Sequence, residues 1–109
     1  MAPVPKLFQP IKVGNVTLQH RIALAPMTRM RCTADNIPLP IMKDYYVQRA
    51  HTPGTLLISE AASIHPAAVT FPNVPGIYND LQIKAWKEVS HISFSIIFKG
   101  NHYYRHDRS

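Results

Sequence analysis

Residues 21–30 read Arg-Ile-Ala-Leu-Ala-Pro-Met-Thr-Arg-Met, and this stretch decides how the rest of the chain is interpreted. A short apolar run over residues 22–25 ends at Pro26 and is followed by a hydroxyl group and cations. The run predicts a buried parallel strand, which should end at the proline or stay at a sheet edge because proline lacks the N–H that a sheet ladder needs. In α/β folds, ligands bind beyond the carboxyl ends of the strands. The polar residues just past this strand are therefore candidate site residues: Thr28, Arg29 and Arg31.

The segments around this strand predict a β-hairpin and then a strand–helix–strand unit. Residues 7–19 contain alternating apolar side chains on either side of Gly14-Asn15, a pair that favours a tight hairpin turn. Apolar residues recur at helical spacing between Pro40 and Thr52, which predicts a helix. Residues 55–61 form a second apolar run without alternation, as expected for a strand covered on both faces. A right-handed βαβ unit follows from this order of elements.

A second helix is predicted after a proline-containing loop at residues 62–78. Asn79 is the expected N-cap, and Gln82 stands three residues later, in the place of a capping-box partner. Further on, residues 90–98 alternate over their first part but also carry apolar side chains at helical spacing. An edge strand and a continuation of the helix both remain open for this segment.

Bulk composition limits the class of protein. The chain has 109 residues, 46% of them hydrophobic, and a single cysteine, which excludes an internal disulfide and a cysteine-rich zinc site. We find no signal-peptide pattern and no apolar run of about 20 residues, so we expect a cytoplasmic protein without a membrane span. A net charge of +6 suits an anionic cofactor or a nucleic acid, although scattered cations are more typical of a solvated surface.

The order of the motifs over residues 7–89 resembles the Old Yellow Enzyme family of flavin-dependent NAD(P)H oxidoreductases. The segments that carry this resemblance are Leu-Phe-Gln-Pro-Ile-Lys-Val-Gly at residues 7–14, His20-Arg21, Ala25-Pro26-Met27-Thr28-Arg29-Met30, Tyr45-Tyr46, Gln48-Arg49-Ala50, Pro53-Gly54-Thr55, Leu57-Ile58-Ser59-Glu60-Ala61, Pro75-Gly76-Ile77 and Trp86. The resemblance implies an α/β fold, namely an N-terminal fragment of a TIM (β/α)₈ barrel. This fragment would comprise the hairpin that closes the bottom of the barrel and about two β/α units.

The resemblance stops after Val89, so residues 1–89 are interpreted as part of the FMN-binding barrel and residues 90–109 as a divergent tail. Glu-Val-Ser at residues 88–90 can be encoded by GAG-GTA-AGT, which matches a splice-donor consensus, and we hypothesise that the tail is a retained intron. The tail contains His102 and His106 at a spacing that can bind metal on a helix, together with neighbouring aromatic and basic residues. Solvated side chains are the simpler interpretation, and no metal site is predicted.

The resemblance also implies which residues contact the cofactor FMN. Pro26, Met27 and Thr28 would lie against the flavin ring, with the Thr28 hydroxyl near the C4 carbonyl and N5. Ala61 would provide the small side chain that close approach of the ring requires. From the residues alone, a strand-end turn residue is the favoured interpretation of Thr28, and strand packing explains Ala61 nearly as well as a flavin contact. Glu60 is a lone carboxylate in an apolar run, and burial without a partner would be costly, so Arg29 is a candidate partner.

By resemblance, the function is that of an FMN-dependent NAD(P)H oxidoreductase, which transfers a hydride from reduced FMN to an activated alkene. No catalytic residue is predicted within this chain, because the family's substrate-anchoring pair, proton-donating tyrosine and phosphate ligands lie beyond the matching region. A barrel of this class usually needs about 250 residues, so we expect the fragment alone to be inactive. Two alternatives remain: a non-catalytic interaction module that pairs its exposed strands with another chain, and a small basic nucleic-acid binder. The sequence does not predict an oligomeric state.

Overall fold

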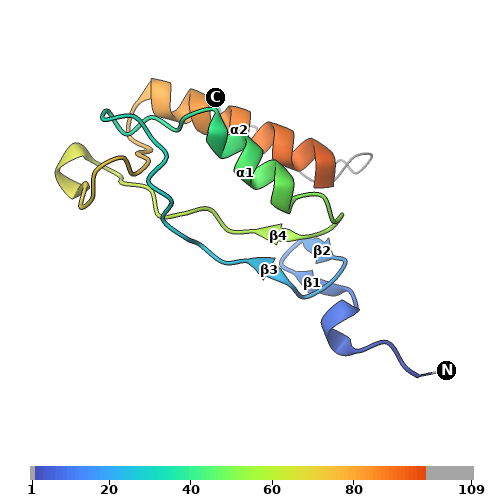
Figure 1. Cartoon of the computed structure of the whole chain (residues 1–109). Helices are drawn as coiled ribbons and strands as arrows, with labels where there is room; N and C mark the ends of the chain where they lie inside the picture. The colour runs from blue at the N-terminus through green and yellow to red at the C-terminus, as the bar shows by residue number, and fades with distance from the viewer. Residues whose placement is uncertain (1, 98–109) are drawn as a thin grey trace.

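The computed structural model describes the backbone of residues 2–97 and the side chains of residues 2–91. Two helices lie on one side of a pair of parallel strands, and a β-hairpin precedes the first of these strands (Figure 1). The elements in chain order are η1 (Lys6–Phe8), β1 (Ile11–Val13), β2 (Val16–Leu18), β3 (Ala23–Leu24), α1 (Ile41–Arg49), β4 (Leu56–Leu57), η2 (Pro66–Ala68) and α2 (Asp80–Ile97).

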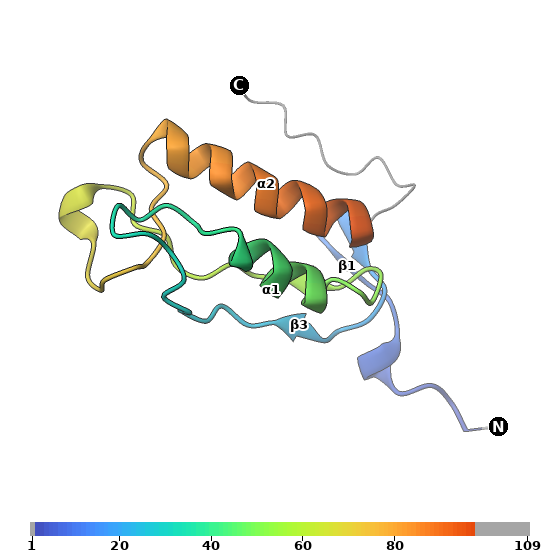
Figure 2. The same ribbon diagram turned by 45° about the horizontal axis from the view of Figure 1, so that its top comes forward.

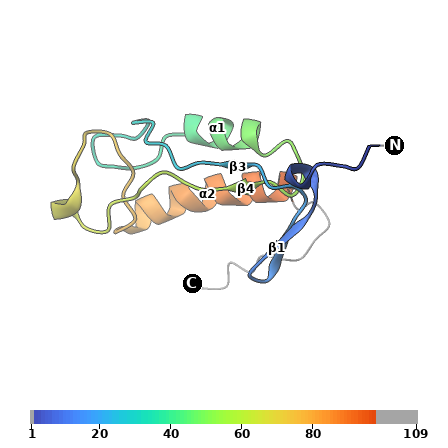
Figure 3. The same cartoon turned by 90° about the horizontal axis from the view of Figure 1, so that it is seen from below.

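The predicted hairpin is confirmed over β1 and β2, which pair antiparallel with Ile11 opposite Leu18 and Val13 opposite Val16. Gly14 in the turn has a φ of +58°, a left-handed conformation that glycine adopts without steric cost. The hairpin stands at one end of the molecule, close to the start of β3 (Figure 3). It therefore leads the chain directly into the first parallel strand.

The two predicted parallel strands are present but short. Ala23 pairs with Leu56 and Leu24 with Leu57, and the Ile58 N–H donates to the Leu24 carbonyl at 3.1 Å. The prediction that the second strand is covered on both faces is wrong for this chain. Leu24 and Leu57 pack against the core residues of the helices. Leu56 in β4 and Ile58 just after it project to the other face of the strand and are 36% and 42% exposed. Nothing in the described part of the chain covers that face, since both helices lie opposite.

The core lies between the strands and the two helices, which run side by side (Figure 2). Its centre consists of four buried residues, and the ring of Trp86 packs against them: Cys32, Met42, Tyr46 and Val89. The Lys43 ammonium and the Glu88 carboxylate form an ion pair at 3.8 Å between α1 and α2. Such an exposed pair contributes little, so apolar burial holds the helices in place.

The α2 helix begins at the cap that the sequence predicts. The Gln82 N–H donates to Asn79 Oδ1 at 2.9 Å, while Gln82 Oε1 accepts from the Tyr78 N–H at 2.9 Å, one residue earlier than a standard capping box. The helix continues to Ile97, so over residues 90–97 the structure favours helix continuation over an edge strand. No helix in residues 2–97 has the length and apolar character needed to cross a membrane.

Candidate functional site

The carboxyl ends of β3 and β4 define the candidate site. If the register of the two strands is continued past their ends, Thr28 falls opposite Ala61, since Leu24 pairs with Leu57. A hydrogen bond shows that the two segments stay close past the strands, because the Arg29 N–H donates to Glu60 Oε2 at 2.8 Å. The fold thus brings the two separately predicted segments to neighbouring positions at one edge.

The predicted cofactor residues are all accessible at this edge. Pro26, Met27, Thr28 and Ala61 are exposed, and Met27 has 45% of its surface accessible. The Thr28 side chain forms no hydrogen bond to another described residue, so its hydroxyl is free to bind a ligand. A methyl group at position 61 and an unpaired hydroxyl at position 28 fit a planar ring lying close to the backbone, and the residues present are therefore compatible with a flavin. Their contacts with FMN remain a prediction.

Glu60 is the most deeply buried charged group near the site, with 3% of its surface exposed. The predicted partner residue is Arg29, but the donor is its backbone N–H, while its guanidinium group lies 5.9 Å from the centre of the Tyr45 ring. Glu60 Oε1 is buried and has no hydrogen-bond partner among the described residues. Burial raises the pKa of the Glu60 carboxyl, and the Arg29 hydrogen bond and charge oppose this rise.

Tyr46 lies beside the site, although the sequence analysis did not name it as a candidate site residue. It is buried, but its hydroxyl also accepts a hydrogen bond from the Glu60 N–H at 3.2 Å. Burial raises the pKa of the Tyr46 hydroxyl above its usual value, so it remains protonated at neutral pH. A lone carboxylate in an apolar run was the available signal that such a polar contact existed.

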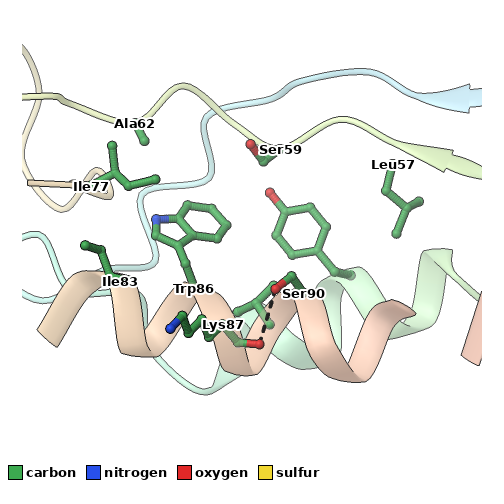
Figure 4. Close-up of a pocket in the computed structure, with 10 residues that line it drawn as sticks. Leu57, Ser59, Ala62, Ile77, Ile83, Trp86, Lys87 and Ser90 are labelled. Carbon is green, nitrogen blue, oxygen red and sulfur yellow. Dashed lines mark hydrogen bonds between the residues drawn. The ribbon is translucent and has the colours of Figure 1, made fainter. Parts of the chain in front are cut away.

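Two cavities adjoin these residues from the helix side. One, of about 230 Å³, is lined by Glu60, Arg29, Arg31 and Tyr45 among others. The other, of about 530 Å³, lies between the segment after β4 and α2, with Ser59 and Ala62 on one side and Trp86 on the other (Figure 4). None of the predicted flavin contacts lines the larger cavity, so it is distinct from the strand-end site.

Metal chemistry has no support in the part of the chain that the structure describes. Residues 2–91 contain no group of three or more histidine, cysteine, aspartate or glutamate side chains placed to hold a metal ion. His102 and His106, and the aromatic and basic residues beside them, lie outside the described residues.

A hairpin followed by parallel strands, with helices on one side and a site at the strand ends, defines the opening portion of a β/α barrel. Residues 6–92 match the NADH:flavin oxidoreductase / NADH oxidase family, and the chain belongs to this family. The cofactor of the family is FMN, with NAD(P)H as reductant, as the sequence predicts. The family resemblance inferred from the motifs is thereby confirmed.

Similar proteins agree with this assignment. The chain is 61% identical over 85 residues to "Chanoclavine-I aldehyde reductase fgaOx3" of Penicillium roqueforti (78% of this chain, 23% of the relative). It is 52% identical over 96 residues to "NADP-dependent oxidoreductase lnbE" of Aspergillus flavus (85% of this chain, 26% of the relative). The crystal structure of Old Yellow Enzyme from Pichia sp. AKU4542 superposes with a TM-score of 0.80 at 41% identity, over 84% of this chain and 24% of that one.

The chain thus spans about a quarter of the length of these relatives. The fold prediction of an N-terminal fragment of a TIM barrel is confirmed by the barrel it superposes on. The family match extends to residue 92, so it includes the first residues beyond Val89. The proposed boundary between barrel and tail, and the intronic origin of the tail, stay predictions.

Proposed function

We propose that this chain supplies one wall of the flavin site of an FMN-dependent NAD(P)H oxidoreductase of the Old Yellow Enzyme type. The observation that carries the proposal is the hydrogen bond from the Arg29 N–H to Glu60 Oε2, which joins the segments that carry Thr28 and Ala61 past the ends of two parallel strands. This is the edge at which β/α barrels place their active sites. Family membership supplies the identity of the ligand.

Each residue would have a separate part in holding the ring. The Thr28 hydroxyl would hydrogen-bond to the C4-carbonyl and N5 edge, an interaction of about 0.5–1.5 kcal/mol. Backbone groups of Pro26 and Met27 would complete that edge, and the Ala61 methyl group would leave room for the ring. When bound, FMN supplies the hydride chemistry, taking a hydride from NAD(P)H and passing it to an activated alkene, and the protein supplies binding and orientation.

The chain by itself is proposed to be inactive as a reductase. Its two short strands form only part of a barrel wall, whereas a complete barrel of this class usually needs about 250 residues. Steady oxidation of NADPH by the purified chain with added FMN should not exceed the background of free flavin. A rate clearly above that background would contradict this part of the proposal.

Binding of the ring itself can be tested by nuclear magnetic resonance with two flavins. Lumiflavin has the isoalloxazine ring but no phosphate, and we expect it to bind about as well as FMN, since the contacts proposed here are with the ring alone. In the ¹⁵N-labelled chain, both flavins should shift the amide resonances of Met27, Thr28 and Ala61. The variants Thr28→Val and Ala61→Leu should weaken the binding of both flavins.

Matched controls for these variants are Thr17→Val on β2 and Ala67→Leu in η2, which are exposed and lie in segments away from the strand ends. Neither should alter the response to lumiflavin. Shifts confined to other parts of the chain, or no shifts with either flavin, would overturn the proposed ring site.

One observation favours a second function, an interaction module. In the part of the chain that the structure describes, Leu56 and Ile58 form an exposed apolar face and each parallel strand has an unpaired edge, which is a surface suited to pairing with another chain. A monomeric chain at all accessible concentrations would count against it. The nucleic-acid alternative depends on the basic tail, which lies outside the described residues.

A further inference from the structure

Near Thr28 and Ala61, one hydrogen bond joins the segments that follow β3 and β4. Past the Ile58–Leu24 backbone bond, residues 25–29 and 59–62 share one hydrogen bond, from the Arg29 N–H to Glu60 Oε2. Thr28 directly precedes Arg29, and Ala61 directly follows Glu60. The bond therefore spans the gap one residue away from the proposed ring contacts on each side.

Glu60 is itself fixed from the helix side. Its backbone N–H donates to the Tyr46 hydroxyl at 3.2 Å, and Tyr46 belongs to the buried core on α1. The Glu60 side chain therefore projects from a backbone position that the core holds in place. Through its hydrogen bond with the Arg29 N–H, this side chain can hold the segment after β3 in a fixed place relative to the core.

The segment after β3 needs such a restraint. Met30, the residue after Arg29, has a φ of +55°, a left-handed conformation that is uncommon for a side chain other than glycine, asparagine or aspartate. Strained backbone of this kind persists only where surrounding contacts enforce it. Glu60 restrains the residue before Met30 through the Arg29 N–H, while the residue after it, Arg31, accepts a hydrogen bond from the Leu39 N–H at 3.3 Å.

We propose that Glu60 is a positioning residue that locks the segment Pro26–Thr28 at a fixed distance from Ala61, and so shapes the ring site. This inference rests on the proposed function, because the restraint matters for binding only if a flavin binds at this site. The restraint on residues 26–28 is itself a property of the unliganded chain. Glu60 touches neither reacting atoms nor, as proposed here, the flavin. It acts through Arg29.

The charge of Glu60 should change the strength of its hydrogen bond with the Arg29 N–H. The titratable and charged groups around its carboxyl are Arg29 and Arg31 from the segment after β3, Cys32 beyond them, and Tyr45 and Tyr46 from α1. Because Oε2 already accepts from Arg29, a proton would bind at the unpartnered Oε1. Protonation would leave Oε2 as a weaker, neutral acceptor rather than remove the bond.

The test compares Glu60→Gln, which keeps shape and an acceptor, with Glu60→Leu, which keeps volume but has no acceptor. The measurements are ¹⁵N order parameters of the Met27 and Thr28 amides and hydrogen exchange of the Arg29 amide, with circular dichroism to check folding. In Glu60→Leu the order parameters should fall from about 0.85 to below about 0.6. Arg29 exchange should be roughly tenfold faster than in Glu60→Gln.

A packing role alone would give a different pattern. If only side-chain volume mattered, the leucine and glutamine variants would behave alike at Met27 and Thr28, and that result would overturn the proposal. A pH titration adds a second readout, because the wild-type Arg29 amide proton should shift as Glu60 ionises and the shift should vanish in Glu60→Gln. Absence of that shift in the wild type would also overturn it, even if Glu60→Leu does not fold.

Exposed Glu88 provides the matched control, since Glu88→Gln and Glu88→Leu make the same chemical changes on α2. Neither should alter the order parameters of Met27 and Thr28. Lumiflavin titration separates this inference from the proposed function. If the wild-type chain binds no lumiflavin, the proposed ring site is wrong, while the order parameters still test whether Glu60 restrains residues 26–28. If the chain does bind lumiflavin, Glu60→Leu should weaken binding roughly tenfold and Glu60→Gln much less.

Discussion

Cys32 is a buried residue whose surroundings make its thiol less reactive than that of an ordinary cysteine. It is 3% exposed, and its Sγ donates to Met42 Sδ at 3.6 Å. Burial, and to a lesser degree the charge of Glu60, raises the pKa of the thiol from 9.0 to about 12. Since the thiolate is the nucleophile, this thiol is inert in the folded state.

Reaction with a thiol reagent checks this residue directly, because the chain has a single cysteine. A rise in pKa from 9.0 to about 12 lowers the thiolate fraction at mildly alkaline pH by roughly a thousandfold. Modification of the native chain should therefore be slower than that of the urea-unfolded chain by about this factor, and burial should slow it further. Equal rates in the two states would show that Cys32 is not buried.

At the scale of an element, the start of α2 depends on polar side chains more than on apolar ones. Gln82 is fully buried, accepts from the Tyr78 N–H, and donates from Nε2 to the Asp35 carbonyl at 3.1 Å. Asn79 caps the helix through the Gln82 N–H. The helix start is thereby tied to the loop that follows the first strand.

Truncation of these two side chains should have unequal effects. Asn79→Ala loses one cap and should lower the free energy of unfolding by about 1 kcal/mol. Gln82→Ala removes a fully buried side chain together with its hydrogen bonds to the Tyr78 N–H and the Asp35 carbonyl, so it should cost at least about 2 kcal/mol. Urea unfolding followed by circular dichroism measures both, and Gln48→Ala on the exposed side of α1 is the control, expected to stay within about 0.5 kcal/mol. If Gln82→Ala costs no more than Gln48→Ala, the loop contact contributes nothing.

At the scale of the whole molecule, the described chain is a barrel wall with one face uncovered. Leu57 packs under the helices while Leu56 and Ile58 face away, and within residues 2–97 each parallel strand bonds to one neighbour only. Open strand edges beside exposed apolar side chains promote association. The tendency to associate follows from the strands themselves and does not depend on whether the chain binds a flavin.

Sedimentation over a range of concentrations should therefore detect self-association of the purified chain. The double variant Leu56→Thr with Ile58→Thr keeps β-propensity while removing apolar surface, and it should shift the equilibrium toward monomer by tenfold or more. Ile64→Thr is the control, because Ile64 is 77% exposed but lies away from the strands. A wild-type chain that stays monomeric throughout would contradict this expectation.

The sequence by itself determined the family, the order of hairpin, strand, helix and strand, and the cap of the last helix, because these depend on local patterns such as Gly14-Asn15 and Asn79. It did not determine that β4 is covered on one face only, since an unbroken apolar run looks the same whether or not a partner layer is present. Nor could it show that the Arg29 backbone, and not its guanidinium group, satisfies Glu60. Tertiary structure decided these points, because burial and hydrogen bonding between residues 31 positions apart depend on how strands and helices meet in space.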